Sequence, residues 1–396
     1  MNLPLLFLSL LGLSMFFERA RYEISRIGMT VIEKTQLLPI FLSWNTTLEI
    51  SHPLVYSDIR DKLLPNFLYE HHYRDYATRA TAQLDQLVED ELVCFRNNQK
   101  HCLSHDSAEN MIASKPYKDN ELVMKDPIIY PAVIEPQISA YNDTQVIIAI
   151  PTSPSQYIER IAIRATWCNS TLTKSKRVKC VFCCATSDIS ANVDQFLKEE
   201  AELYNDIVQF PFRNSYLNLT RLQFSSYSWI AKHIPSAKFI IRSDSDMFVN
   251  PDLIVKKLIP YPKKNFIYGV LIDGGIPIRH PLSKYYFPKW LFAEDRFPAY
   301  VSGCFYIWST DVLGKVINAS DVIRPIHYID DVYYGQIFRH YKLRITPDRG
   351  YLYWDQIPIS NLFFTHVAAA HRYSPIDLKV IWKLYHQSLV CSTNTF

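Results

Sequence analysis

The chain has 396 residues, of which 48% are hydrophobic and 14% aromatic, and its formal net charge at pH 7 is +3. This length and apolar content allow one large domain or two ordinary ones, with a real hydrophobic core. The 42 basic and 39 acidic residues are dispersed without a run of Lys and Arg, which argues against a nucleic-acid partner.

An apolar segment runs from Leu3 to Phe17 near the start of the chain. At about 15 residues it is short for a membrane-spanning helix and has the length of a signal-peptide core. No clean small-x-small cleavage site follows it. We expect residues 1–21 to be a signal anchor that attaches the protein to a membrane, with a cleaved signal peptide as the alternative.

Eight cysteines and five Asn-x-Ser/Thr sequons are spread along the chain. The sequons begin at Asn45, Asn142, Asn169, Asn218 and Asn318. None of the cysteine spacings reproduces a paired C-x-x-C zinc module. Together with the N-terminal segment, these features favour a location in the lumen of the secretory pathway, where cysteines can pair.

Residues 22–140 contain no repeat and no low-complexity tract, and we interpret them as a stem. Ile59 to Cys94 reads as helical, because apolar and charged residues are interleaved there. From Leu103 to Gln137 the chain is polar and punctuated by proline, which is typical of a linker or of an arm lying on the next domain.

From Gln145 onward, short apolar runs alternate with helical segments. The apolar runs are 146–150, 178–184 and 238–241, and the helical segments extend to about Trp167, over 191–204 and over 217–233. This alternation predicts an α/β domain with a largely parallel sheet over residues 141–396. Ligands of such sheets bind beyond the carboxyl ends of the strands, so we expect the chemistry just after Ile150, Cys184 and Ile241.

Two carboxylates, Asp244 and Asp246, directly follow the third predicted strand. Separated by one residue at a strand's carboxyl end, they can converge on one hard divalent cation that keeps positions open for water and phosphate oxygens. Phe248 to Pro251 then leads into a predicted helix at Asp252. The alternative is a surface loop, since Asp-x-Asp also occurs by chance.

A second acidic pair, Asp330 and Asp331, stands at the start of a predicted helix. A carboxylate there can act as a general base if partial burial sets its pKa and an acceptor hydroxyl lies beside it. The alternative is that the two acids only stabilise the helix N-terminus.

His371 lies just before another predicted helix start. Ser374 has the character of an N-cap, Pro375 suits the first helical position, and Asp377 completes a capping pattern. His371 is therefore either a metal ligand placed just outside a helix or an ordinary loop histidine.

Six blocks stand in a specific order between Thr144 and Cys391: Arg160–Trp167, Glu202–Thr220, Phe239–Asn250, Pro298–Tyr306, Asp330–Gly335 and His371–Cys391. In this order they resemble the β-1,3-galactosyltransferase family (glycosyltransferase family 31), which also includes β-1,3-N-acetylglucosaminyltransferases. The resemblance implies a GT-A fold with a Rossmann-like, largely parallel central sheet. It further implies UDP-sugar donors, Mn²⁺, inversion at the anomeric carbon and a β-1,3 linkage.

The resemblance also assigns roles to individual residues, several of which lie in the block Phe239–Asn250, called the metal block below. Asp246 and His371 are expected to bind the metal. Asp244 is expected to bind it as well, directly or through water, or to contact the ribose of the donor. Arg164 and Ser245 are expected on the side of the donor nucleotide and diphosphate.

On the acceptor side, the resemblance makes Asp331, with Asp330 beside it, the base that deprotonates the acceptor 3-hydroxyl. The acceptors would be glycans on glycoproteins, glycolipids or proteoglycans, and the protein would be a single-pass type II Golgi membrane protein with a luminal catalytic domain. Nearby aromatic residues are candidates for lining the acceptor site: Tyr285, Tyr286, Trp290, Tyr300, Tyr306 and Trp308.

The chain departs from the family's usual pattern at Asn214, Leu222 and Ser245. Ser245 still leaves the two outer carboxylates of the metal block in place. Because of these three departures, the alternative to an active transferase is an inactive luminal family member that binds glycans or a working transferase.

Overall fold

A computed structural model of the chain describes residues 127–169, 177–258, 261–326, 328–357, 359 and 363–393, together with 81–82, 84–86, 88, 117, 122 and 124. The predicted signal anchor and most of the predicted stem lie outside the described residues. Within the described part of the chain, no helix has the length and the apolar run that crossing a membrane requires.

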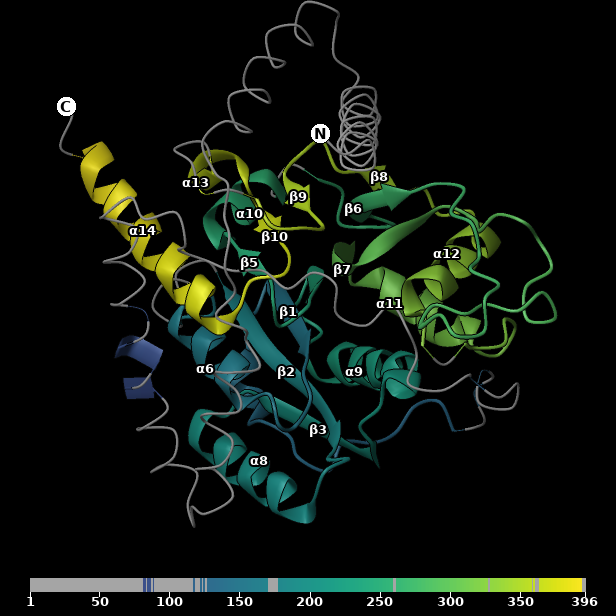
Figure 1. Cartoon of the computed structure of the whole chain (residues 1–396), viewed down its shortest axis with the longest axis horizontal. Coiled ribbons are helices and arrows are strands. Elements are labelled where there is room, and N and C mark those ends of the chain that lie inside the picture. The colour runs from purple at the N-terminus through teal and green to yellow at the C-terminus, as the bar shows by residue number, and fades with distance from the viewer. Residues whose placement is uncertain are drawn as a thin grey trace, which may run out of the picture.

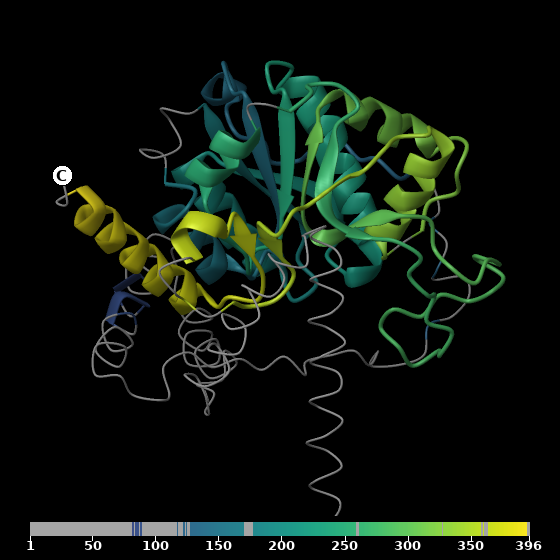
Figure 2. The same cartoon turned by 90° about the horizontal axis from the view of Figure 1, so that it is seen from above.

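Seven strands form the central sheet in the order β3-β2-β1-β4-β7-β6-β8 (Figures 1 and 2). Their bounds are Val146–Pro151 (β1), Val178–Thr186 (β2), Ile207–Arg213 (β3), Phe239–Ser243 (β4), Ile267–Ile272 (β6), Tyr300–Ser309 (β7) and Thr346–Pro347 (β8). The strands from β3 to β4 run parallel, whereas β7 is antiparallel to both β4 and β6. The predicted α/β class with a largely parallel sheet is confirmed, and the three predicted strands correspond to β1, β2 and β4.

A small second sheet has the order β5-β10-β9 and lies next to the central sheet in Figure 1. Its strands are Phe248–Val249 (β5), Leu352–Tyr353 (β9) and Ala369–Ala370 (β10). Because β5 follows β4 after a four-residue turn, this sheet stands at the carboxyl end of the parallel strands. The mostly parallel central sheet with this accessory sheet is compatible with the GT-A fold that the resemblance implies.

Helices cover both faces of the central sheet (Figure 1). They are Tyr157–Ala165 (α6), Ala191–Tyr204 (α8), Leu219–His233 (α9), Pro251–Leu258 (α10), Asp311–Ala319 (α11), Asp330–His340 (α12), Phe363–His366 (α13) and Pro375–Thr393 (α14), with 3-10 turns at Ile138–Tyr141 and Tyr216–Asn218. The predicted helices over 191–204 and 217–233 match α8 and α9. The helix expected to reach about Trp167 ends at Ala165, where the Thr166 hydroxyl donates to the Ala162 carbonyl.

Alternate residues of β1 point to opposite faces of the sheet. Ile147 and Ala149 pack with buried residues of α9, α11 and α12. Ile148 and Ile150 pack with residues of α6, α8 and α14. Because both faces are covered, this strand needs apolar residues at every position, which is why its run was recognisable in the sequence.

The sequence analysis did not identify β3, β6 and β7 as strands. Each carries polar or small residues inside its run, such as Gln209 in β3, Gly269 in β6 and Gly303 in β7. These residues interrupt the continuous apolar pattern on which recognition of a buried strand depends.

Residues 127–140 lie against the edge strand β3. Val133 donates its backbone N–H to the Gln209 carbonyl at 2.7 Å, and the Gln209 N–H donates to the Ile134 carbonyl at 2.9 Å. This part of the predicted linker is therefore an arm that covers an otherwise open sheet edge. The predicted boundary between stem and catalytic domain at residue 141 stays a prediction.

A disulfide joins Cys168, just after α6, to Cys180 in β2. Among the described residues, Cys183, Cys184 and Cys304 are buried free thiols. The pairing agrees with the expectation that cysteines of this chain can form disulfides.

Two helical glycines provide a matched test of how closely α12 packs on β7. A Cβ at Gly335 would lie 2.8 Å from Tyr300 Cβ and 3.1 Å from the Ala299 carbonyl oxygen, whereas a Cβ at Gly314 in α11 would meet nothing within 4 Å. We expect Gly335→Ala to lower the free energy of unfolding by about 1–3 kcal/mol through overpacking. Gly314→Ala should raise it by about 0.5–1 kcal/mol through helix propensity.

Urea denaturation of both variants measures the difference. Equal stability of the two would show that the α12–β7 contact is looser than described.

Candidate active site

Asp244 and Asp246 lie in the turn between β4 and β5, where the chain leaves the central sheet. All five residues of β4 are buried, so the first partly exposed carboxylate appears where the strand ends. The Asp244 backbone N–H donates to the Cys304 carbonyl of β7 at 2.9 Å. The antiparallel neighbour β7 therefore fixes the start of the turn.

The small sheet brings His371 to these carboxylates from the far end of the chain. β10 pairs antiparallel with β5, with Ala370 opposite Phe248, so the residue after β10 lies beside the residues before β5. His371 Nε2 lies 3.0 Å from Asp246 Oδ1 and 3.6 Å from Asp244 Oδ2.

The start of α14 fixes where His371 stands. The Ser374 N–H donates to Asp377 Oδ2 at 2.8 Å, and the Asp377 N–H donates to Ser374 Oγ at 3.2 Å. The predicted capping box and the predicted Pro375 helix start are both confirmed. The Tyr373 N–H donates to the Asp246 carbonyl at 2.9 Å, which ties this segment to the metal block.

Asp244, Asp246 and His371 fit a divalent cation. Each offers one ligand atom, and these atoms lie within 4.8 Å of one another. Carboxylate oxygens with one imidazole are a donor set that suits Mn²⁺. His371 Nδ1 lies 3.3 Å from the Trp354 carbonyl oxygen, a contact that orients the ring and leaves Nε2 facing the carboxylates.

The ionisation of the three groups is tightly linked. Burial raises the pKa of Asp244 above its ordinary value, against the charge of Arg242. Burial also opposes ionisation of Asp246, but the hydrogen bond and charge of His371 outweigh it, so the pKa of Asp246 is lowered. Burial lowers the pKa of His371 less than the two carboxylates raise it. The cluster thus already holds positive charge close to its carboxylates.

The acid pair lies in the first turn of α12. Asp330 is buried at 4% exposure, whereas Asp331 is partly exposed. Asp331 Oδ1 accepts a hydrogen bond from the Val332 N–H at 2.8 Å. Both acids are at a position where the helix dipole favours negative charge, so the stabilising role considered from the sequence is compatible with a catalytic one.

Burial raises the pKa of Asp331 to about 7, and the neighbouring charge of Asp330 adds to the increase. Burial also raises the pKa of Asp330. A carboxylate with a pKa near neutrality is suited to take up a proton at physiological pH.

Three tyrosines from other elements lie within electrostatic reach of Asp331. Tyr216, in the turn before α9, Tyr285, in the β6–β7 connection, and Tyr300, in β7, all have pKa values raised by burial and by the charge of Asp331. Tyr285 is 37% exposed and Trp290, in the same connection, is 51% exposed. The β6–β7 connection thus offers one partly exposed ring, that of Tyr285, within electrostatic reach of Asp331.

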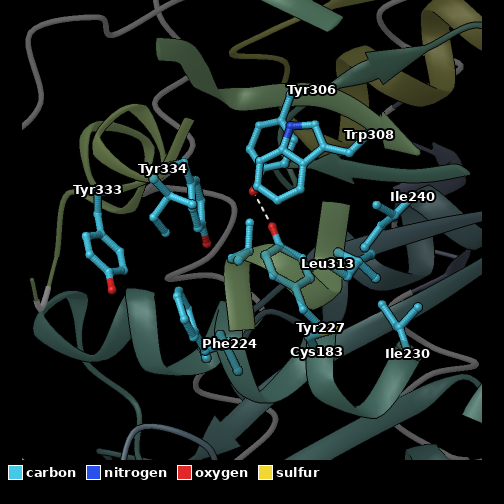
Figure 3. Packing of buried hydrophobic residues seen from close by; sticks show 14 of the residues in the cluster. Cys183, Phe224, Tyr227, Ile230, Ile240, Tyr306, Trp308, Leu313, Tyr333 and Tyr334 are labelled. Carbon is cyan, nitrogen blue, oxygen red and sulfur yellow. Dashed lines mark hydrogen bonds between the residues drawn. The ribbon is translucent and has the colours of Figure 1, made fainter. Parts of the chain in front are cut away.

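Two of the aromatic residues considered for the acceptor site do not belong there. Tyr306 and Trp308 are each 0% exposed. They lie in β7 between β4 and β6, and their rings, with centroids 4.5 Å apart, face the helices in the core shown in Figure 3. Burial in the middle of the sheet removes them from any contact with a glycan.

Arg164 lies in an ion-pair cluster near the start of β3. Its guanidinium binds Asp206 through two hydrogen bonds of 2.8 Å and Glu200 through one of 2.6 Å. It also lies 3.9 Å from the ring centroid of Tyr204. These contacts fix the Arg164 guanidinium within this cluster, and its expected role toward the donor nucleotide stays a prediction.

Arg160, one turn earlier in α6, was quoted in the sequence analysis only as part of a block. Its fully buried guanidinium pairs with Glu200 and donates to the carbonyls of Ser153 and Pro154 at 2.8 and 2.9 Å. Arg160 therefore holds the loop that follows β1, at the edge where a ligand was expected.

The three departures from the family pattern lie in different surroundings. Ser245 Oγ accepts a 3.5 Å hydrogen bond from Gln156 of the β1–α6 loop. Asn214 donates to Ser153 Oγ of the same loop at 3.2 Å. Leu222 lies on α9 and is buried in the hydrophobic core. Ser245 and Asn214 thus border the loop at the end of β1, and Leu222 has a packing role.

Arg242 is a site residue that sequence reasoning missed. It is the fourth residue of β4, and its buried side chain points under the metal block, where Nη2 lies 2.8 Å from Asp244 Oδ1. Its Nη1 donates to the Gly303 carbonyl. A charged residue inside an otherwise apolar strand was the available signal, because a buried charge requires a partner.

Comparison with known proteins is consistent with this geometry. The galactosyltransferase family model matches residues 158–349. Beta-1,3-galactosyltransferase 2 of Mus musculus is 30% identical over 263 residues, which cover 64% of this chain and 61% of the relative. Beta-1,3-galactosyltransferase 1 of Mus musculus is 30% identical over 251 residues, which cover 63% of this chain and 76% of the relative. The chain belongs to the galactosyltransferase family.

One similar solved structure is a glycosyltransferase involved in the glycosylation of the major capsid of PBCV-1. The superposition covers 61% of the present chain and 99% of the solved one. The TM-score is 0.34 and the identity 11%, and a superposition this loose carries no conclusion. The segment matched by the family model includes Asp244, Asp246 and the acid pair, whereas His371 lies beyond it.

Loss of a ligand should weaken cation binding in this family member. We expect Asp246→Asn and His371→Ala each to raise the dissociation constant for Mn²⁺ at least about 100-fold, the upper end of what an outer-shell partner costs. Asp295→Asn, at a carboxylate that is 87% exposed, should leave it unchanged. Titration calorimetry with Mn²⁺ measures all three, and wild-type affinity in both site variants would rule out this ligand set.

Proposed function

We propose that this protein is an inverting, metal-dependent glycosyltransferase that moves a hexose or N-acetylhexosamine from a UDP-sugar to the 3-hydroxyl of an acceptor glycan. Membership of the galactosyltransferase family favours galactose as the transferred sugar. N-acetylglucosamine is the second candidate.

The observation that supports the proposal is the link, through Gly303 and Arg242, between Asp331 and Asp244 of the Asp244–Asp246–His371 cluster. Gly303 of β7 lies between them. Its carbonyl accepts a hydrogen bond from the arginine that binds Asp244, and a Cβ on its other side would lie 3.3 Å from Asp331 Oδ2. Gly303 thus connects the Asp331 carboxylate, whose pKa is raised, to Asp244 of the candidate cation site by way of Arg242. This arrangement suits the attack of an acceptor hydroxyl on a nucleotide-linked sugar.

In this mechanism, Asp244, Asp246 and His371 would hold Mn²⁺, which when bound supplies positive charge to the diphosphate of the departing UDP. Asp331 accepts the proton of the acceptor 3-hydroxyl while that oxygen attacks the anomeric carbon. The bond from this carbon to the diphosphate oxygen breaks on the opposite side, so the configuration inverts. One displacement completes the transfer without a covalent enzyme intermediate.

The β1–α6 loop is the proposed binding site of the donor nucleotide. It follows the carboxyl end of β1, where ligands of parallel sheets bind. Arg160 holds its carbonyls from beneath, and Gln156 links it to Ser245 of the metal block. Ser245 is thereby linked to the proposed donor loop, and we keep Arg164 as a further candidate for contact with the donor nucleotide or diphosphate.

The proposed acceptor site is formed by Tyr216, Tyr285 and Tyr300 around Asp331. Tyrosine offers an apolar ring for the C–H face of a sugar and a hydroxyl for its polar groups. Acceptors in this proposal are glycans on glycoproteins, glycolipids or proteoglycans.

We further propose that the protein resides in the Golgi as a type II membrane protein with its catalytic domain in the lumen. The disulfide between Cys168 and Cys180 supports an oxidising compartment. The sequon residues Asn142 and Asn318 are exposed, as an N-glycan requires.

Replacing Asp331 should separate catalysis from donor binding. We expect Asp331→Asn to lower the transfer rate by about 10²–10⁴-fold, the usual contribution of a general base, without weakening Mn²⁺-dependent UDP binding. The assay measures UDP release from a panel of UDP-sugars, with Mn²⁺ or EDTA, and with β-linked Gal, GlcNAc and GalNAc acceptors. Asp311→Asn, at the start of α11, is the matched control and should keep full activity.

Acceptor-stimulated release that survives in Asp331→Asn would disprove the assigned base. Mn²⁺-dependent UDP binding without turnover of any donor would instead indicate an inactive, glycan-binding family member.

The transfer rate should also depend on pH through Asp331. Its pKa is raised to about 7 and the base must be ionised, so the rate should fall as pH is lowered through this value and level off above it. The expected decrease is about tenfold per pH unit on the acidic side. A rate that stays constant between pH 8 and pH 5.5 would contradict the assignment.

A further inference from the structure

A buried polar cluster lies beneath the proposed active site, and the reaction as described above does not use it. It consists of Arg242 from β4, Tyr306 from β7, Tyr227 from α9, and Asp330 and Tyr334 from α12. Tyr227 and Tyr306 share a hydrogen bond between their hydroxyls, drawn as a dashed line in Figure 3, with Tyr334 beside them. Every member is nearly or fully buried.

Arg242 is the cation of this cluster. Its side chain is 4% exposed and binds Asp244 Oδ1 at 2.8 Å on the side of the metal block. On the other side, its charge acts on Asp330 and on the two tyrosine hydroxyls that share the hydrogen bond. Burying a guanidinium is costly unless carboxylates and carbonyls surround it, and here Asp244, Asp330 and the Gly303 carbonyl do so.

Arg242 and Asp330 interact through their charges and not through a hydrogen bond. Arg242 Nε and Asp330 Oδ2 are a donor and an acceptor of opposite charge, and neither has a hydrogen-bond partner among the described residues. Arg242 is also the largest of the influences that favour the ionised form of Asp330. The two groups are therefore electrostatic partners within the cluster.

Gly303 connects Arg242 to the base. Its carbonyl accepts from Arg242 Nη1, and a Cβ added to it would lie 3.3 Å from Asp331 Oδ2 and 3.5 Å from Asp331 Cγ. The guanidinium thus holds the strand segment against which the Asp331 carboxylate packs. Movement of Arg242 would displace Asp244 and Asp331 together.

We propose that Arg242 is a positioning residue that holds the cation-binding carboxylate Asp244 and the base Asp331 in one geometry through a single guanidinium. The proposal rests on the function proposed above for Asp331. Arginine suits this role because its planar fork directs separate N–H groups at the Asp244 carboxylate and the Gly303 carbonyl, whereas lysine offers one point charge.

The charge of Arg242 has a second consequence, for the pKa of Asp331. Asp331 faces Asp330 from its own helix, Arg242 from β4, and the tyrosines 216, 285 and 300 from the other elements packed against it. Arg242 is the cation that lowers the pKa of Asp331 in this set. Removing it should raise that pKa, because an ionised Asp331 would then face Asp330 without compensation.

The experiment uses the full chain with Arg242→Met, Arg242→Lys and the surface control Arg339→Met, whose ion pair with Glu294 is about half exposed. Two quantities are measured for each: the affinity for Mn²⁺ by calorimetry, and the pH dependence of UDP release. For Arg242→Met we expect about 10–100-fold weaker Mn²⁺ binding. We also expect the acidic limb of its pH profile, the range in which the rate of UDP release falls as pH is lowered, to move up by about one pH unit.

Arg242→Lys keeps the charge and should leave the acidic limb in place, while it weakens Mn²⁺ binding less than Arg242→Met does. Arg339→Met should change neither quantity. Wild-type Mn²⁺ affinity and an unmoved limb in a folded Arg242→Met variant would overturn the proposal.

A further variant covers the case in which Arg242→Met fails to fold. Gly303→Ala pushes on the Asp331 carboxylate, which lies 3.3 Å from the added Cβ, while the Gly303 carbonyl still accepts from Arg242, so it should lower the transfer rate more than it weakens Mn²⁺ binding. An unchanged transfer rate in Gly303→Ala would show that Gly303 does not position the base and would overturn the proposal.

Failure of the proposed function is distinguishable from failure of this inference. If the wild type binds Mn²⁺ but transfers no sugar, the function fails. The positioning role is then decided by whether Arg242→Met weakens Mn²⁺ binding more than Arg242→Lys.

Discussion

The antiparallel pairing of β7 with β4 is the constraint on which the candidate site depends. β4 ends at the metal block, and the Asp244 N–H bonds to the Cys304 carbonyl of β7. The same strand passes Gly303 close to the acid pair at the start of α12. A parallel sheet alone would place ligands at strand ends. The antiparallel strand β7 adds a second surface beside the metal block, and the acid pair packs against it.

Electrostatics reinforces this arrangement because the site concentrates acids in a small, partly buried volume. Asp246 raises the cost of ionising Asp244, Asp244 that of Asp330, and Asp330 that of Asp331, whereas the charge of Arg242 favours the ionised form of all four acids. A divalent cation would complete this compensation. A bound cation would take over the charge-compensating role of the His371 proton, because imidazole binds a metal in its neutral form.

Much of the α/β fold could be predicted from the sequence, because its central strands are buried on both faces and its long helices are amphipathic. β1, β2, β4, α8 and α9 were recognised in this way. β3, β6 and β7 were not, because an edge position or a close contact requires polar residues or glycine inside the strand. Gly269, for instance, lies on β6 where a Cβ would come within 3.0 Å of Val301 Cβ on β7, a contact invisible in local sequence.

For the site, the sequence by itself determined the chemical groups: an Asp-x-Asp pair after a strand, an acid pair at a helix start, and a histidine before a capped helix. Local patterns suffice for these because turns and caps are formed by neighbouring residues. Only the tertiary structure decided which groups meet. Two-residue strands bring His371 to Asp246, and the buried contacts of Arg160, Arg164 and Arg242 assign one arginine each to a loop, an ion-pair cluster and the active site. These partners lie far apart in the chain, and long-range pairing leaves no periodic signal in the sequence around either residue.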